Sequence, residues 1–198
     1  MELLCRRAHR TLRNANVSAD AMRMRKVVCF ALMALVLTPS EAGVVLGVEA
    51  RGHLEGLRPV GSGSVLQDGE RDNKAVVVAF FASWCPPCRD EFSALNRLHL
   101  EMGDKPARIV AVNLFEAWDD DDAARLRRFL ALTKPSFALV KGTDETVQAF
   151  GNVDRIPSVF VFDSEGRERW RFIHLRGATK VSATLEQLRL AVGLALAK

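Results

Sequence analysis

From residue 75 onward, apolar residues form short unbroken runs and longer stripes with helical spacing. Residues 75–82 (AVVVAFFA) are β-branched and aromatic without alternation, which predicts a strand buried on both faces of a sheet. Residues 86–102 predict a helix whose first turn, residues 89–91, is exposed. The buried face of this helix is expected to carry the apolar residues spaced three or four positions apart, namely Phe92, Leu95, Leu98 and Met102.

The same patterns continue to the C-terminus. Further strands are predicted at residues 108–114, 137–140, 158–162 and 167–174, and further helices at 121–132, 146–150 and about 179–196. The inward-facing residues expected on the two longer helices are Leu126, Phe129, Leu130, Leu185, Leu188, Val192 and Leu196. The turn Asp163–Gly166 should join the last two strands into an antiparallel hairpin. This order predicts an α/β fold with a mixed central β-sheet, helices on both faces and a parallel strand–helix–strand unit at its start.

Charge is distributed unevenly along the chain. Residues 1–42 contain seven basic and three acidic groups, while the rest of the chain contains 21 of each. The leader therefore accounts for the whole net charge of +4. A neutral body gives no electrostatic reason to expect a nucleic acid partner.

The leader, residues 1–42, also has the parts of a secretory signal. A basic cluster at residues 23–26 precedes an uncharged run at residues 27–37, and small residues end the leader. The run of eleven residues is shorter than the roughly 20 that cross a bilayer as a helix. We therefore expect a cleaved signal peptide and a periplasmic or cell-envelope location. An uncleaved membrane anchor through residues 27–37 is the alternative, and Met22 or Met24 is a possible true start.

Between the leader and the predicted sheet lies a mixed segment. Residues 43–73 are interpreted as a linker and N-terminal extension, in which Gly61–Ser64 forms a flexible turn and Asp68–Gly69 a hairpin turn. The main domain is then expected to span residues 74–198.

Two cysteines form the chemical centre of the sequence. Cys85 and Cys88 lie three positions apart, where the first predicted strand meets the first long helix. A dithiol in the first turn of a helix can form a disulfide without large backbone movement, and the thiolate meets the positive end of the helix dipole. Pro86 and Pro87 carry no backbone N–H, so the first amides available to the Cys85 sulfur are those of Cys88 and Arg89.

A two-thiol metal site is the competing interpretation of this motif. Zinc takes four ligands, and the four histidines of the chain form no ligand-spaced pair with each other or with the thiols. We therefore expect no metal and no cofactor. A metal or copper chaperone that uses the two thiols is kept as a minor alternative.

The sequence resembles the thioredoxin fold, specifically its exported TlpA/ResA-like branch. The stretches that carry the resemblance are VAFFASWCPPCRDEF (78–92), IVAVNLFE (109–116) and IPSVFVFDSEG (156–166), in the order and spacing of the family. The resemblance implies that Cys85 is the nucleophile and Cys88 the resolving thiol of a redox-active disulfide. It also implies that Cys85 is the more exposed of the two.

The resemblance assigns three further residues to substrate binding. Pro157 matches the family's cis-proline, which would turn the backbone of Ile156 toward an extended substrate. An ordinary trans proline at a strand start is the alternative. Trp84 is expected either to shape the substrate surface or to pack in the core.

A carboxyl group is expected near the thiols. Thioredoxin carries a buried Asp in the strand before the motif, but Ala79 occupies that position here. The exported branch instead has a Glu after the second strand, which Glu116 matches. Its implied role is to accept the Cys88 proton, with partial desolvation and a raised pKa. A plain surface acid is the alternative.

These features together predict a thiol–disulfide oxidoreductase of the cell envelope. The resemblance favours reduction of disulfides in exported proteins, as in cytochrome c maturation or at metal-site thiols. The expected partners are protein disulfide substrates and a membrane electron donor or acceptor. A disulfide oxidase or isomerase is the alternative enzyme, because sequence does not fix the reduction potential.

Overall fold

The computed structural model describes residues 43–60, 75–103, 107–117 and 120–197. The predicted leader and the turns at residues 61–64 and 68–69 lie outside these residues. In chain order the elements are α3 (Val48–Gly56), β1 (Ala75–Phe81), α4 (Pro86–Met102), β2 (Ala107–Asn113), α5 (Asp120–Thr133), β3 (Ala138–Lys141), α6 (Asp144–Ala149), β4 (Ser158–Asp163), β5 (Glu168–Ile173) and α7 (Leu185–Leu196). Within the described part, no helix combines the length and apolar character needed to cross a bilayer.

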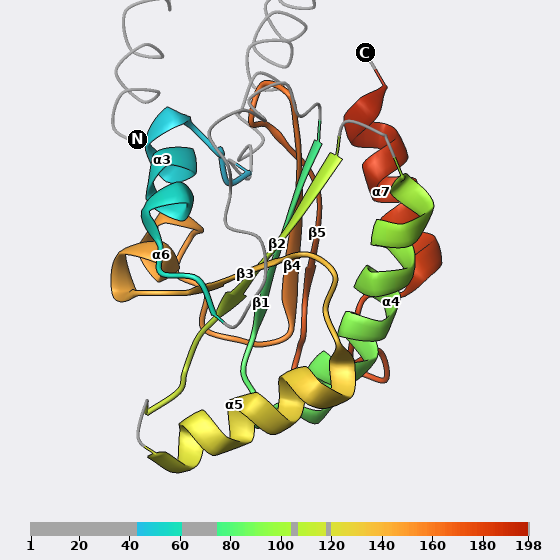
Figure 1. Cartoon of the computed structure of the whole chain (residues 1–198). Helices are drawn as coiled ribbons and strands as arrows, with labels where there is room; N and C mark the ends of the chain where they lie inside the picture. The colour runs from blue at the N-terminus through green and yellow to red at the C-terminus, as the bar shows by residue number, and fades with distance from the viewer. Residues whose placement is uncertain (1–42, 61–74, 104–106, 118–119, 198) are drawn as a thin grey trace, which may run out of the picture. The chain divides into compact units, whose positions relative to one another are not determined.

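The strands form one five-stranded mixed sheet in the order β3-β2-β1-β4-β5 (Figure 1). β1, β2 and β3 run parallel, whereas β4 is antiparallel to both β1 and β5. All seven residues of β1 are buried, as expected of a strand covered on both faces. The predicted hairpin, the parallel start and the α/β class are confirmed.

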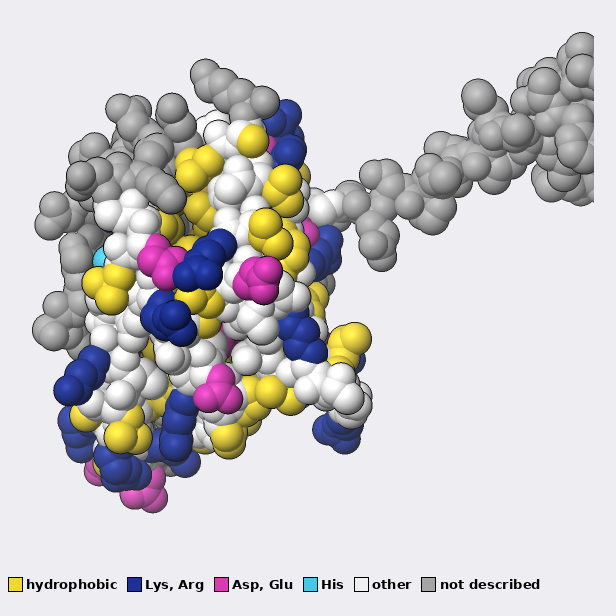
Figure 2. Space-filling model, turned by 90° about the vertical axis from the view of Figure 1, so that its right-hand side faces the viewer, with side chains coloured by type: hydrophobic (Ala, Val, Ile, Leu, Met, Phe, Trp, Pro, Cys, Tyr) yellow, Lys and Arg dark blue, Asp and Glu magenta, His cyan; other side chains and the backbone are white. Residues whose placement is uncertain are grey.

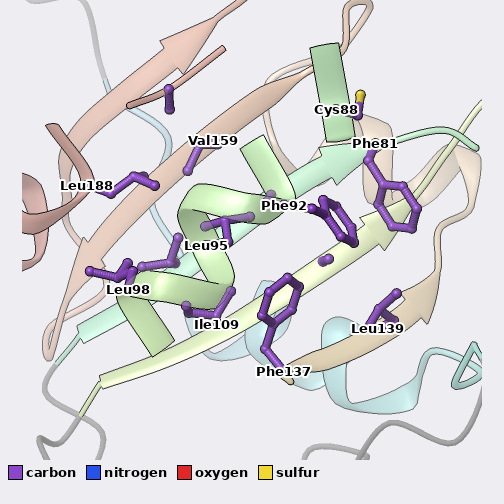
Figure 3. Close-up of a cluster of buried hydrophobic side chains, with 14 of the residues drawn as sticks. Phe81, Cys88, Phe92, Leu95, Leu98, Ile109, Phe137, Leu139, Val159 and Leu188 are labelled. Atoms are coloured by element: carbon purple, nitrogen blue, oxygen red, sulfur yellow. The ribbon is translucent and has the colours of Figure 1, made fainter. Parts of the chain in front are cut away.

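Two apolar clusters occupy the two faces of the sheet. One cluster joins alternate residues of β1 and β2 to α4, α5 and α7, and the other joins the intervening residues to α3 and α6. Figure 1 shows the same division, with α4 and α7 on one side and α3 and α6 on the other. In the first cluster, the Phe81 and Phe92 rings point toward each other with centroids 4.6 Å apart, and Phe92 packs edge-on against Phe137 at 5.4 Å (Figure 3).

The predicted buried face of α4 is confirmed, because Phe92, Leu95, Leu98 and Met102 are all buried. The prediction of an exposed first turn is wrong for Glu91, which is fully buried. The solvent side of α4 and α7 carries interspersed basic, acidic and apolar side chains (Figure 2). Across it, Arg189 forms a bidentate ion pair with Glu101.

Capping moves the start of two predicted helices. α7 begins at Leu185 rather than near residue 179, because Thr184 and Gln187 form a reciprocal capping box there. Its buried stripe is Leu188, Ala191, Val192 and Ala195, while Leu185 and Leu196 are half-buried. A second capping box, between Thr143 and Thr146, starts α6 two residues earlier than predicted.

The segment before β1 contains α3, which the sequence analysis did not predict. Leu54 and Leu57 of this segment are buried in the second cluster, and the Leu46 amide donates to the Gly166 carbonyl at 2.8 Å. Short bridges pair Val45 with Arg167 and Pro59 with Val140. Residues 43–60 therefore cover one face and two edges of the sheet.

Candidate active site

The topology brings two distant segments together at one end of the sheet. β1 and β4 are antiparallel neighbours, and Phe80 is paired with Ser158. The end of β1, which leads into Cys85, therefore lies beside the start of β4, which Pro157 precedes. This arrangement follows from strand direction, since an antiparallel pair places the end of one strand next to the start of the other.

A disulfide joins Cys85 and Cys88, whose Cα atoms are 5.4 Å apart. Cys85 is the N-cap of α4, and Pro86 and Pro87 fill the first two helical positions, where a missing N–H is tolerated. Cys85 is 3 % exposed and Cys88 0 %, so the expected order of exposure holds although both are enclosed. In this form the Cys88 amide donates to the Cys85 carbonyl at 3.2 Å. That leaves the helix dipole and the Arg89 amide to favour a Cys85 thiolate.

The peptide bond between Ile156 and Pro157 is cis, as the resemblance implied. The Pro157 carbonyl accepts a hydrogen bond from the His174 amide at 3.0 Å, which ties this turn to the end of β5. Among the described residues, the backbone of Ile156 has no hydrogen-bond partner. It therefore presents a free donor and acceptor beside the disulfide.

Glu116 follows the end of β2 and forms hydrogen bonds with the loop that leads to the thiols. Its carboxylate accepts from the Ser83 amide at 2.5 Å, the Ser83 hydroxyl at 3.1 Å and the Asn113 side-chain amide at 3.1 Å. Glu116 is half-buried, so it is not the plain surface acid of the alternative interpretation. The contacts fix the backbone two residues before Cys85.

Glu91 is the residue that the sequence analysis missed. It is fully buried on α4, three residues after Cys88, and burial raises the pKa of its carboxyl from 4.5 to about 8. One carboxyl oxygen accepts from the Ala183 amide at 3.3 Å, and the other has no partner within the described structure. Helical residues three apart have Cβ atoms about 5–6 Å apart, so the Glu91 carboxyl and the Cys88 thiol share one side of α4.

An open cleft of about 700 Å³ is lined by Trp84, which precedes Cys85, and by Ile156, which precedes Pro157. Trp84 is 48 % exposed, and its indole N–H donates to the Phe115 carbonyl at 2.9 Å. The core-packing alternative for Trp84 is therefore wrong. The full lining is Trp84, Phe115, Asp154, Arg155, Ile156, His174, Arg176 and Gly177.

The described residues contain no group of three or more His, Cys, Asp and Glu side chains arranged to hold a metal ion. A closed zinc site needs four ligands.

The mixed sheet, the disulfide at the start of α4 and the opposing cis-proline define a thioredoxin-fold protein with a dithiol centre. The Redoxin family model matches residues 61–188, and the chain belongs to this family.

Two curated relatives and one solved structure illustrate the similarity. The thioredoxin-like protein YneN of Bacillus subtilis is 36 % identical over 109 residues, which are 54 % of this chain and 59 % of the relative. The thiol-disulfide oxidoreductase ResA of the same organism is 26 % identical over 106 residues, 54 % of this chain and 56 % of the relative. The chain thus spans little more than half the length of these relatives. They confirm the resemblance to the TlpA/ResA-like branch.

The solved structure is that of a secreted Mycobacterium tuberculosis disulfide oxidoreductase homologous to DsbE. It is 17 % identical and superposes with a TM-score of 0.56, covering 74 % of this chain and 98 % of the other. At this identity the likeness concerns the fold, which agrees with the sheet order and helix placement described above.

Proposed function

We propose that the protein is a thiol–disulfide oxidoreductase in which Cys85 and Cys88 alternate between dithiol and disulfide. The observation that carries the proposal is the position of the disulfide, in the first turn of α4 and opposite cis-Pro157. Membership of the Redoxin family and the names of the relatives support it.

In the proposed reaction, the Cys85 thiolate attacks one sulfur of a substrate disulfide and displaces the other as a thiolate. Cys88 then loses its proton and attacks Cys85 in the mixed disulfide, which releases the second substrate thiol. The substrate gains two electrons and two protons, and the protein dithiol loses them. Cys85 is the attacking residue because it lies at the helix N-terminus and is the less enclosed sulfur.

Two carboxyl groups serve this reaction in different ways. The pKa of Glu91, about 8, is close to that of an ordinary thiol, about 8.5. Glu91 therefore holds its own proton in most molecules at neutral pH, and its ionised form, which becomes more abundant as pH approaches 8, can accept the Cys88 proton at little cost in free energy. Glu116, the residue to which the family resemblance assigned the proton, is engaged by three donors. We therefore assign the Cys88 proton to Glu91 and the positioning of the motif loop to Glu116.

Single substitutions distinguish these two roles. In reduced protein, Glu91→Gln should shift the pH at which Cys88 becomes reactive toward iodoacetamide, because the proton acceptor is lost. Glu116→Gln should slow disulfide reduction at every pH without moving that midpoint, because it loosens the Ser83 contact. A shifted midpoint in Glu116→Gln and none in Glu91→Gln would reverse the assignment.

The cellular setting is also part of the proposal. The basic and apolar pattern of residues 1–42 supports export to the periplasm or cell envelope, either as a soluble protein or anchored through residues 27–37. There the dithiol would reduce disulfides of exported proteins, such as cytochrome c precursors or metal-site thiols. A membrane electron donor would reduce it again. The alternative is an oxidase, which would transfer its disulfide to the substrate, or an isomerase, which would rearrange substrate disulfides, by the same exchange reaction.

One experiment tests the activity, the direction and the substrates together. Cys88→Ala in the full chain should accumulate mixed disulfides through Cys85 in the cell envelope, and mass spectrometry identifies the partners. The matched control is Cys85→Ala, in which the remaining sulfur is fully buried and should trap nothing. If neither variant traps a partner and the purified protein shows no two-electron transition in glutathione buffers, the proposal fails.

A further inference from the structure

The residues that line the cleft indicate which substrates the protein would prefer, whereas the thiols alone do not. Cys85 is only 3 % exposed, so a substrate sulfur must approach it through a narrow opening. Trp84 precedes Cys85 and Ile156 precedes Pro157, so the cleft that these residues line is the adjoining surface. The inference below rests on the proposed function, because it concerns the substrate of that reaction.

The apolar side of the cleft is made by two exposed aromatic residues. Trp84 is 48 % exposed and Phe115 is 44 % exposed. The Trp84 indole N–H donates a hydrogen bond to the Phe115 carbonyl. Phe115 has a φ of 58°, the left-handed region that a bulky side chain enters at a cost of about 1–2 kcal/mol. Because Phe115 is 44 % exposed, burial offsets only part of that strain in the free protein. Strained backbone beside an exposed apolar surface indicates contact with a partner.

The cleft lining also contains two basic residues. Arg155 and Arg176 are both exposed, and the only acid in the lining is Asp154. Asp154 pairs with Arg155 at 3.5 Å, whereas Arg176 has no ion-pair partner among the described residues. With His174 neutral, the lining carries a net charge of +1. Since the body as a whole is neutral, this positive edge is local to the site.

The backbone of Ile156, which also lines the cleft, favours an extended ligand. The amide and carbonyl of Ile156 have no hydrogen-bond partner among the described residues and lie next to cis-Pro157. A polypeptide in β conformation can pair with such a free edge, and its alternate side chains then point to opposite sides. Different side chains of the bound segment could then contact the aromatic residues and the arginines of the lining.

We infer that this cleft selects extended, acidic polypeptide segments that carry a large apolar residue beside the reactive cysteine. The apolar side chain packs on Trp84 and Phe115, and a nearby carboxylate faces Arg176 and Arg155. The redox step is unchanged: the peptide disulfide gains two electrons and two protons and becomes a dithiol, while Cys85 and Cys88 form a disulfide. Phe115 and Arg176 are therefore specificity-determining residues.

The test uses short peptides closed by an internal disulfide and identical except for the residues beside it. One pair differs in charge, with two glutamates or two lysines, and another pair differs in having leucine or serine next to the cysteine. Reduced full-length protein is mixed with each peptide, quenched in acid, alkylated and quantified by mass spectrometry. Uncharged hydroxyethyl disulfide serves as a reference substrate that lacks both features.

We expect the glutamate peptide to react about three to ten times faster than the lysine peptide at low ionic strength, the range given by one or two exposed ion pairs. High salt should shrink the ratio, because it screens exposed charges beyond a few ångströms. Arg176→Glu should bring the ratio to about one or below. Phe115→Asn, which also tolerates a positive φ, should slow the leucine peptide more than the serine peptide.

The matched control is Arg127→Glu, which makes the same charge change at an exposed position on α5 outside the cleft. It should retain the wild-type ratio. If hydroxyethyl disulfide is reduced but the glutamate and lysine peptides react equally fast, the inference about the cleft is overturned while the oxidoreductase stands. If no disulfide is reduced at all, the proposed function itself has failed.

Discussion

The carboxyl group of Glu91 is the least expected single feature of the site. A helix that packs on a sheet normally buries apolar residues, and an unpaired buried carboxylate is strongly disfavoured. Glu91 avoids that penalty by keeping its proton, as its pKa of about 8 indicates. The thioredoxin position for a buried acid, residue 79, is an alanine in this chain. The acid is thus supplied by the helix that carries the thiols instead of by the strand.

This burial makes stability depend on pH. The folded-state pKa of Glu91, about 8, lies above its ordinary value of 4.5, so between these two values the folded protein binds more protons than the unfolded chain. The free energy of unfolding of the oxidised protein should therefore fall as pH rises through this window, by at most about 5 kcal/mol. Urea denaturation at a series of pH values measures the fall.

Glu91→Gln removes the titrating group and should flatten that dependence. Glu55→Gln, at an exposed position of α3, is the control and should leave the fall in place. A wild-type profile that stays level between pH 5 and 8 would contradict the burial of an ionisable group at position 91.

Helical spacing in the sequence is enough to place Glu91 on the buried face of α4. Position 91 lies three residues after Cys88 and four before Leu95, so helical spacing places it on the buried face. Charged residues are almost never fully buried, and residues 89–91 were predicted to form an exposed first turn. By contrast, the cysteines and the cis-proline were found because motif and order along the chain point to them directly. The cleft lining could not be found, since residues 84, 115, 155 and 176 meet only through the fold.

At the scale of elements, the long strands and α4 were predictable because their apolar patterns are unambiguous. α3 was not, since its sequence VEARGHLEG has few apolar residues and includes two glycines. It is helical because Leu54 and Leu57 find a partner surface on the sheet, and tertiary contact outweighs weak local preference. The start of α7 was misplaced because residues 179–183 (TKVSA) contain no glycine or proline that would separate them from the helix begun by the capping threonine, Thr184.

The β4–β5 turn anchors the N-terminal segment, and this contact depends on a glycine. Gly166 has a φ of 76°, and a Cβ atom there would overlap the carbonyl group of Leu46. Gly166→Ala should therefore lower the free energy of unfolding by more than about 1 kcal/mol, measured by urea denaturation.

A second glycine provides the opposite expectation. Gly193 lies inside α7 with open space around it, so Gly193→Ala should raise stability by about 0.5–1 kcal/mol through helix propensity. Equal and small effects at both positions would argue against the Gly166–Leu46 contact.

At the scale of the whole molecule, the sheet separates the redox centre from the apolar cluster on its other face. Cys85 and Cys88 belong to the cluster that α4, α5 and α7 cover, while α3 and α6 cover the other cluster. Ile156 packs against both clusters, so it is the described residue that joins the site to each face. We expect changes on the α3 face to affect stability more than thiol chemistry.

Leu54→Ala tests this separation. Leu54 is 3 % exposed in the α3 cluster, and its truncation should lower the free energy of unfolding by about 2–5 kcal/mol. The glutathione equilibrium of the dithiol should stay within a factor of about two, since oxidised and reduced forms lose the same contact. A large change in that equilibrium would show that the two faces are coupled.

The position of Trp84 has an optical consequence. A disulfide quenches the emission of a neighbouring indole, and Trp84 is directly bonded to Cys85 with its ring fixed by the Phe115 carbonyl. Reduction should therefore increase the tryptophan fluorescence, and Trp84→Phe should abolish the increase. The other two tryptophans of the chain, Trp118 and Trp170, remain in Trp84→Phe, so an increase that survives in this variant would contradict this origin. The chain thus carries its own label-free indicator of redox state, from which single-turnover kinetics can be followed in real time.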